Sequence, residues 1–315
     1  HTQRRRQRQM CIRDRTISRL GVDSYRVVTG GADGNRDWVT LRNYRDDNGL
    51  NADINIRTHD IATLGLWGPK AVNALGNFID PNEIDIQNFP FVTAKNLTLN
   101  LSGGKKVDVW AARISYVGES GWEIYFNNNK EDGLAIYDSL LEVGVVPVGI
   151  ETYANSRRLE KSFRLQGADL ETEYTAIEAA IQRPLVKEAD FHGKAAHLSH
   201  REEDPCAILC TMTLDDLNVS GVPRYPVGIS PIIDPATGEV PVDTKGRRSY
   251  TTGMSYCPSI KKFVVMGYLP KELAIQGKQL LIEYFNEDGD GVYPITVQIV
   301  GKGSLYDPNN ERVRA

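Results

Sequence analysis

The sequence of 315 residues lacks any run of about 18 apolar residues, which is the length that an apolar helix needs to cross a bilayer. We therefore expect no membrane-spanning segment. It also lacks the glycine-rich loops GxxxxGK and GxGxxG of nucleotide-binding proteins, the GxSxG nucleophile elbow and the HExxH metal motif. Common signatures of nucleotide-dependent, serine-hydrolase and zinc-peptidase chemistry are thus missing from this chain.

Cysteine is scarce. The chain has four: Cys11, Cys206, Cys210 and Cys257. Cys206 and Cys210 share an apolar, strand-like segment, but no second pair and no histidine stands at zinc-binding spacing from them. We predict reduced cysteines and no metal site.

The charge is nearly balanced overall but uneven along the chain. There are 37 Lys and Arg against 41 Asp and Glu, a net charge of −4, and residues 1–15 alone contain six Arg and one Asp. We interpret 1–15 as a non-native, adapter-like arm, and the chain as one whose N-terminal part is truncated. The remainder is acidic, which argues against a nucleic-acid partner because phosphate backbones select basic surfaces.

Local patterns divide the rest of the chain into two regions. Two pairs of strands are predicted to form hairpins: 16–20 with 25–29, and 96–101 with 107–115, where the residues alternate with a period of two. Further strands are expected at 52–57, which also alternates, at 61–67 and at 122–126. Helical patterns begin near Asp33 or Asn35 and cover 70–78, 131–143 and 151–165. A polar linker is expected at 197–205, and after it come short β segments separated by Gly and Pro. The prediction is an α+β fold over 16–200 with an all-β barrel or jelly-roll domain over 201–315.

The segment 116–123 (YVGESGWE) is the most promising local feature for ligand binding. Its two glycines allow a tight turn, and Trp122 and Glu123 begin a strand, so their side chains point to opposite faces. A carboxylate is a natural partner for a flat heterocycle with adjacent N–H donors, such as a pterin or a guanine. A surface turn with one exposed Glu is the alternative interpretation.

The segment YVGESGWEI resembles the folate-binding signature of the glycine-cleavage T-protein (aminomethyltransferase) family. Further blocks of the resemblance are YRVVTGGADGNRDW (25–38), LWGPKA (66–71), RLEKSFRLQGADLETEYTAIEA (158–179), FHGKAA (191–196) and TGMSYCPSIKKFVVMGYLP (252–270). The resemblance implies a three-lobed fold around a central folate channel, tetrahydrofolate as cofactor and a transferase of one-carbon metabolism.

The resemblance also assigns residues to roles. Glu123 matches the carboxylate that binds the pterin, and Tyr116 matches an aromatic residue that lines the pocket. Asp14, two residues before Thr16 but inside the 1–15 arm, has the spacing of the catalytic Asp. The remaining folate-binding candidates are Trp122 and the strand residues Tyr25, Val27 and Val28.

The helix after the turn indicates a subfamily. Ala154 stands where free T-proteins have a folate-binding Arg. The pattern RLEKxxRxxGxDL resembles the C-terminal folate domain of dimethylglycine and sarcosine dehydrogenases. Within this pattern, Arg158 and Glu160 look like a structural pair. In those proteins FAD binds an oxidoreductase half upstream, so FAD is expected only in a missing upstream half. The implied reaction forms 5,10-methylenetetrahydrofolate from a small N-methyl or aminomethyl donor, in the cytoplasm or in the mitochondrial matrix if the source is eukaryotic.

Besides a folded but catalytically silent domain, three alternatives stay open at this point. One is a free glycine-cleavage aminomethyltransferase, whose partner would be a lipoyl carrier protein, and Ala154 speaks against it. Another is a folate-dependent demethylase on the same fold. The third is a folate-binding iron–sulfur maturation factor, although its KGCYxGQE loop is absent from this chain.

Overall fold

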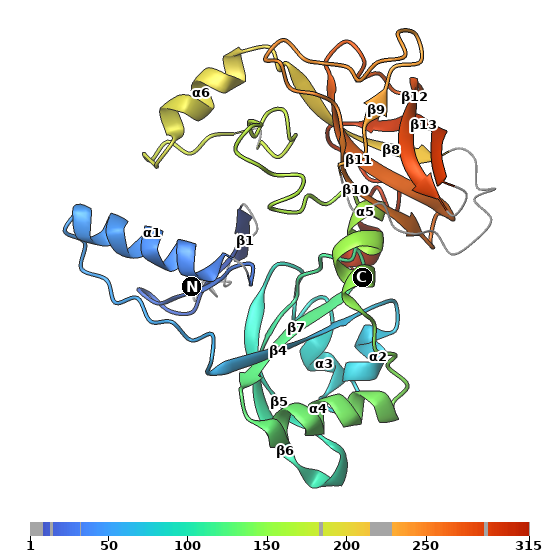
Figure 1. Ribbon diagram of the computed structural model, residues 1–315. Helices are drawn as coiled ribbons and strands as arrows, with labels where there is room; N and C mark the ends of the chain where they lie inside the picture. Colours follow the sequence, from blue (N-terminus) through green and yellow to red (C-terminus); the bar gives the residue numbers. More distant parts are fainter. Residues whose placement is uncertain are drawn as a thin grey trace. The chain divides into compact units, whose positions relative to one another are not determined.

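The computed structural model describes residues 9–12, 15–31, 33–182, 185–214, 229–286 and 289–314 (Figure 1). The chain forms two compact units. The first unit contains the chain up to Ser115, Glu119–Pro147 and the residues from Asn310 onward, and the second contains Tyr116–Gly118 and Val148–Asn309. Within the described ranges, no helix has the length and apolar character needed to cross a membrane.

The first unit is built on a four-stranded antiparallel sheet in the order β4-β7-β6-β5. Its strands are β4 (Ile61–Trp67), β5 (Ala94–Asn100), β6 (Lys106–Ala112) and β7 (Gly121–Asn127). One face packs against α2 (Ala71–Leu75), α3 (Pro81–Ile84) and α4 (Lys130–Glu142) through buried residues such as Leu75, Ile84, Ile136 and Trp122 (Figure 1). We call this the helix face. The opposite face, which carries Trp110, Ala112, Glu123 and Tyr125, is called the outer face.

A smaller sheet precedes this one in the first unit. It consists of β1 (Gln9–Ile12), β2 (Arg15–Arg19) and β3 (Tyr25–Val28), and the predicted hairpin between the last two strands is confirmed. Helix α1 (Gly34–Asp47) follows, and Arg15 Nε donates a hydrogen bond of 2.6 Å to Asp37 Oδ2, which fastens the helix to β2. Val28 packs against the apolar residues of the outer face.

The strand predicted at 52–57 is wrong. These residues have no regular secondary structure, and all but one are exposed. Alternation alone does not make a strand, because a strand also requires a neighbour whose backbone groups pair with its own. The hairpin predicted from 96–101 and 107–115 is confirmed as β5 and β6, joined through the short 3₁₀ turn η1 (Ser102–Gly104).

The second unit contains a curled six-stranded antiparallel sheet in the order β10-β11-β8-β13-β12-β9. Its strands are β8 (Ala207–Leu214), β9 (Ile232–Ile233), β10 (Thr251–Cys257), β11 (Lys262–Pro270), β12 (Gln279–Asn286) and β13 (Gly289–Val300). A bridge between Pro231 and Tyr250 links the two edges. Successive residues of β11 therefore pack in two different hydrophobic cores. Val265 packs in the core enclosed by the curled sheet, and Val264 and Met266 pack in the core on its outer side. The all-β pattern predicted after Cys206 is thus found in the described residues.

Helical segments of the second unit differ from the sequence expectation. The predicted helix 151–165 is a π-helix, η2 (Thr152–Arg157), and one turn of α-helix, α5 (Arg158–Glu160), and it ends where Ser162 takes a positive φ of 53°. The predicted linker at 197–205 contains most of α6 (Lys194–Glu202), and α7 (Glu311–Arg314) ends the described chain.

The predicted division at residues 200 and 201 differs from the division into compact units. The reason is the packing of Leu159 and Ala179 against Leu209 and the outer side of the curled sheet. This buried cluster joins residues on both sides of position 200 into one core. The chain therefore divides near residue 147.

Candidate functional site

Glu123 lies in the middle of β7, on the outer face of the sheet. Trp122 is fully buried on the helix face, where its ring centroid is 6.2 Å from that of Phe89. The prediction that the two neighbours point to opposite faces is therefore confirmed. The structure does not bring Trp122 to the face that carries Glu123, and Trp122 belongs to the core instead.

The carboxylate of Glu123 is partly buried and has one fixed partner. The hydroxyl of Tyr125 donates a hydrogen bond to Oε2. Among the residues that the structure describes, Oε1 has no hydrogen-bond partner. Burial raises the pKa of Glu123 above its ordinary value, and the hydrogen bond from Tyr125 opposes that rise by favouring the charged form. The group is a partly buried hydrogen-bond acceptor whose Oε1 can accept further bonds.

The turn before Glu123 requires glycine for close backbone packing. A Cβ on Gly121 would lie 2.0 Å from the carbonyl oxygen of Leu66, because the turn closes directly onto the end of β4. In the same region Gly68 N donates to the carbonyl of Ser120 at 2.9 Å. Glu119, the other carboxylate of the motif, is buried and lies 3.6 Å from Arg312 Nη1. The structure therefore distinguishes the two carboxylates, since only Glu123 lies on the outer face of the sheet.

Residues of β3 face two ways. Tyr25 and Val27 are exposed, whereas Val28 packs against the outer face of the four-stranded sheet. Asp14, the predicted catalytic residue, lies outside the described residues. Strand β3 and Glu123 therefore belong to the same unit. The catalytic role of Asp14 stays a prediction.

Arg26 joins this region although sequence reasoning did not select it. Its guanidinium lies 4.2 Å from the ring centroid of Trp110 and 5.8 Å from that of Tyr125. The two rings meet edge to face with centroids 5.1 Å apart. The alternation of β3 could have indicated the direction of Arg26, since it stands between two exposed residues. The aromatic partners were not predictable, because they come from strands about 85 and 100 residues later.

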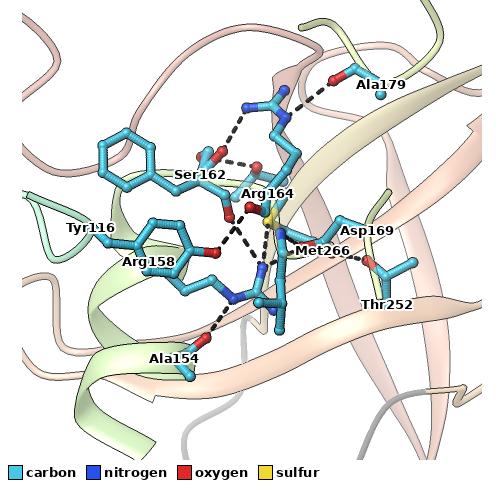
Figure 2. A network of polar contacts seen from close by, with 12 residues as sticks. Tyr116, Ala154, Arg158, Ser162, Arg164, Asp169, Ala179, Thr252 and Met266 are labelled. Carbon is cyan, nitrogen blue, oxygen red and sulfur yellow. Dashed lines mark hydrogen bonds and ion pairs between the residues drawn. The ribbon is translucent and has the colours of Figure 1, made fainter. Parts of the chain in front are cut away.

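Tyr116 belongs to the second unit, where it is part of an aromatic cluster. Its ring stacks on Phe163 with centroids 5.9 Å apart and lies 5.5 Å from Tyr153. Its hydroxyl donates a 2.9 Å hydrogen bond to the carbonyl of Arg164 (Figure 2). Burial raises the pKa of Tyr116 far above its ordinary value, so the phenol stays neutral. The aromatic face of this residue is fixed by its neighbours.

The segment around Ala154 is held by a buried ion pair (Figure 2). Arg158 pairs with Asp169, and both side chains are almost completely buried. Arg158 Nε also donates to the carbonyl of Ala154 at 2.6 Å. The expected pairing of Arg158 with Glu160 is wrong, because Glu160 accepts from Arg157 at 2.7 Å. The network is structural: it joins η2, α5 and the sheet of the second unit.

Comparisons with known proteins agree on one family. The GCVT N-terminal domain family matches residues 2–188. Human mitochondrial dimethylglycine dehydrogenase is 28% identical over 314 residues, covering 95% of this chain and 32% of the relative. An aminomethyltransferase of Symbiobacterium thermophilum is 31% identical over 268 residues, covering 82% of this chain and 65% of the relative. The chain therefore spans about a third of the length of the dehydrogenase that it matches.

A solved structure is similar in fold. It is the crystal structure of glycine cleavage system aminomethyltransferase T from Bartonella henselae, with a TM-score of 0.70 and 20% sequence identity. The match covers 90% of this chain and 70% of that chain. The likeness supports a shared mixed helix and strand fold.

Proposed function

This chain belongs to the GCVT family, the glycine-cleavage T-protein family, and from that premise we propose that it binds tetrahydrofolate and passes a one-carbon unit to it. In the finer form of the proposal, the chain is the folate domain of an FAD-dependent dimethylglycine or sarcosine dehydrogenase. Its product is then 5,10-methylenetetrahydrofolate, and FAD binds a part of the protein outside this sequence.

The observation that carries the proposal is the setting of Glu123. Tyr125 holds one carboxylate oxygen, and the other has no partner among the described residues. A pterin ring offers adjacent N–H donors in one plane, which suits a carboxylate that is fixed in direction and can accept further bonds. Donors of this kind would also stabilise the charged form that burial disfavours. The residues present therefore fit the group.

In this proposal the residues of this chain bind and orient tetrahydrofolate and shield the reacting groups from water. By the same proposal, Glu123 orients the pterin, and the backbone of Tyr25, Val27 and Val28 contacts it. The role of Tyr116 stays a prediction. Asp14 is the proposed acid–base group, and general acid–base catalysis contributes about 10²–10⁴-fold to a rate. Tetrahydrofolate supplies the amine nitrogens that accept the one-carbon unit. Holding the reactants in place while excluding water protects an electrophilic donor from hydrolysis.

A binding titration tests the central residue. Glu123→Ala should weaken tetrahydrofolate binding by about 10–100-fold, the loss expected for hydrogen bonds to a charged group. Glu131→Gln, at an exposed position in the first turn of α4, is the matched control and should leave the affinity unchanged. Equal affinity of Glu123→Ala and the unaltered protein, with both folded by circular dichroism, would overturn the assignment.

A second candidate function is that of a free aminomethyltransferase acting on a lipoyl carrier protein. The 31% identity to the Symbiobacterium thermophilum aminomethyltransferase favours it. Ala154 argues against it, since a folate-binding Arg is expected there in free enzymes. An assay of the full-length protein with dimethylglycine, sarcosine and an aminomethylated lipoyl carrier separates the two functions by the donor that yields methylenetetrahydrofolate.

A further inference from the structure

Two glycines and a tryptophan lie beside Glu123 on the outer face of the four-stranded sheet. Strand β4 places Gly65 directly opposite Glu123 of β7, and it places Trp67 opposite Gly121. Directly opposed residues of antiparallel strands point to the same face of a sheet, with Cβ atoms about 4.5–5.5 Å apart. A side chain at position 65 would therefore stand next to the carboxylate of Glu123, and glycine leaves that place open.

The indole of Trp67 fills that place. A Cβ on Gly65 would lie 2.1 Å from Cζ3 and 2.2 Å from Cη2 of the ring. At the other end of the indole, a Cβ on Gly121 would lie 2.8 Å from Cδ1. The ring thus lies along the sheet over both glycines, and it reaches the position that neighbours Glu123 across the strands.

A hydrogen bond holds the indole in this orientation. Its Nε1 donates to the carbonyl oxygen of Ile114 at 2.8 Å, just after the end of β6. The side chain of Trp67 is only partly buried, in contrast to that of Trp122, which is enclosed in the core. Part of the indole surface is therefore accessible to a ligand.

The two sides of Glu123 differ in accessibility. Gly65, its neighbour on β4, is exposed, whereas Ala112, its neighbour on β6, is completely buried. The open side of the carboxylate is therefore the side of β4, where the indole of Trp67 lies. A molecule that approaches Glu123 from this side meets the aromatic ring next to the acid.

We propose that Trp67 is a ligand-binding residue whose indole stacks on the flat half of the pterin that Glu123 orients. This inference rests on the proposed function and adds a contact to the face of the ring, whereas Glu123 binds its edge. The pyrimidine half of a tetrahydropterin is flat and conjugated, and aromatic side chains bind such rings by stacking. An edge contact and a face contact together select a flat heterocycle.

The test measures tetrahydrofolate binding by isothermal titration calorimetry, in the absence of oxygen, with the full chain. Trp67→Ala should weaken binding about tenfold, the effect of losing one stacked aromatic surface. Trp67→Phe keeps an aromatic ring and loses only the hydrogen bond to Ile114, so it should retain most of the affinity. Tyr137→Ala removes an exposed aromatic residue of α4, which packs on the helix face, and should leave the affinity unchanged.

Gly65→Ala displaces the indole without removing it. The new methyl group would meet the outer end of a side chain that can rotate, so the ring should move at little cost in stability. The affinity should fall about as far as in Trp67→Ala. The double variant Gly65→Ala/Trp67→Ala should bind no more weakly than Trp67→Ala alone, because both changes remove the same contact.

Tryptophan fluorescence gives a readout that a merely structural role would not change. Bound tetrahydrofolate should quench part of the emission of the unaltered chain, because a stacked pterin touches the indole directly. Trp67→Phe saturated with the same ligand should show less quenching, measured after correction for the absorbance of the ligand, although it still binds.

The outcomes separate this inference from the proposed function. If Trp67→Ala and Gly65→Ala stay folded by circular dichroism and bind as tightly as the unaltered chain, the stacking contact is refuted, and a loss of binding in Glu123→Ala keeps the pterin site. If Trp67→Ala weakens binding but Trp67→Phe shows unchanged quenching, the residue acts only through the structure and the inference fails. If the unaltered chain does not bind tetrahydrofolate, both proposals fail.

Discussion

The hydroxyl of Tyr125 donates a hydrogen bond to the carboxylate of Glu123, two residues earlier on the same face of β7. This bond fixes the direction of a partly buried acid and favours its charged form. The ring of Tyr125 also contacts the guanidinium of Arg26 and the ring of Trp110. One side chain therefore links the proposed pterin carboxylate to Arg26 and Trp110.

Tyr125→Phe should weaken folate binding about five- to tenfold near neutral pH, the value of one hydrogen bond of about 1 kcal/mol. Without the phenol donor the pKa of Glu123 rises further, so its charged form is lost at a higher pH. The dissociation constant measured against pH should thus increase earlier on acidification in the variant. Tyr137→Phe, partly exposed on α4, is the control. An identical pH profile for Tyr125→Phe and the unaltered protein would contradict the role of this bond.

Glu123→Gln should stabilise the protein at neutral pH while weakening folate binding. Burial raises the pKa of Glu123, so the folded state loses stability as the pH rises through that raised value. An amide has no charge to bury, so Glu123→Gln avoids this loss. The free energy of unfolding of the variant should therefore exceed that of the parent at pH values above the raised pKa. The difference should disappear at pH values below the ordinary carboxyl pKa of about 4.3. Urea unfolding at several pH values measures it. A variant less stable than the parent at neutral pH refutes the claim.

The strands of the first unit could be predicted because their information is local. Alternation in 96–101 and 107–115 indicates a hairpin, and the same rule places Trp122 and Glu123 on opposite faces. The rule failed at 52–57, which has the same alternation but pairs with no strand in the part of the chain that the structure describes. Whether an alternating segment becomes a strand depends on partners that its own residues do not reveal.

The candidate site was predictable only in part for the same reason. Glu123 stands in a recognisable motif, whereas the contact of Arg26 with Trp110 and Tyr125 joins residues far apart in the chain. Arg158 was expected to pair with Glu160 on its own helix, but the fold supplies Asp169 as a completely buried partner. Long-range pairs form because the fold excludes water from both groups, and no local spacing encodes that exclusion.

Arg158→Met should destabilise the protein by about 3–5 kcal/mol, because it leaves the carboxylate of Asp169 buried without its cation. The double variant Arg158→Met/Asp169→Leu should lose less than the sum of the two single variants, since no lone charge then remains. The midpoint of urea unfolding measures each form. Arg201→Gln, an exposed change on α6, should shift the free energy of unfolding by no more than about 0.5 kcal/mol. Additive losses in the cycle would show that the pair is not coupled.

Gly121→Ala should destabilise the first unit by more than about 2 kcal/mol, because the new methyl group would stand 2.0 Å from the carbonyl oxygen of Leu66. Both groups belong to backbones paired between β4 and β7, so neither can move without breaking the register of Trp67 with Gly121. Gly149→Ala is the matched control, since a methyl group there meets no atom of the described residues within 4 Å. It should be neutral or slightly stabilising through reduced freedom of the unfolded chain. Because Glu123 is only two residues away on the same strand, tetrahydrofolate binding should weaken in Gly121→Ala and not in Gly149→Ala. Unchanged stability and affinity in Gly121→Ala would show that the turn does not position Glu123.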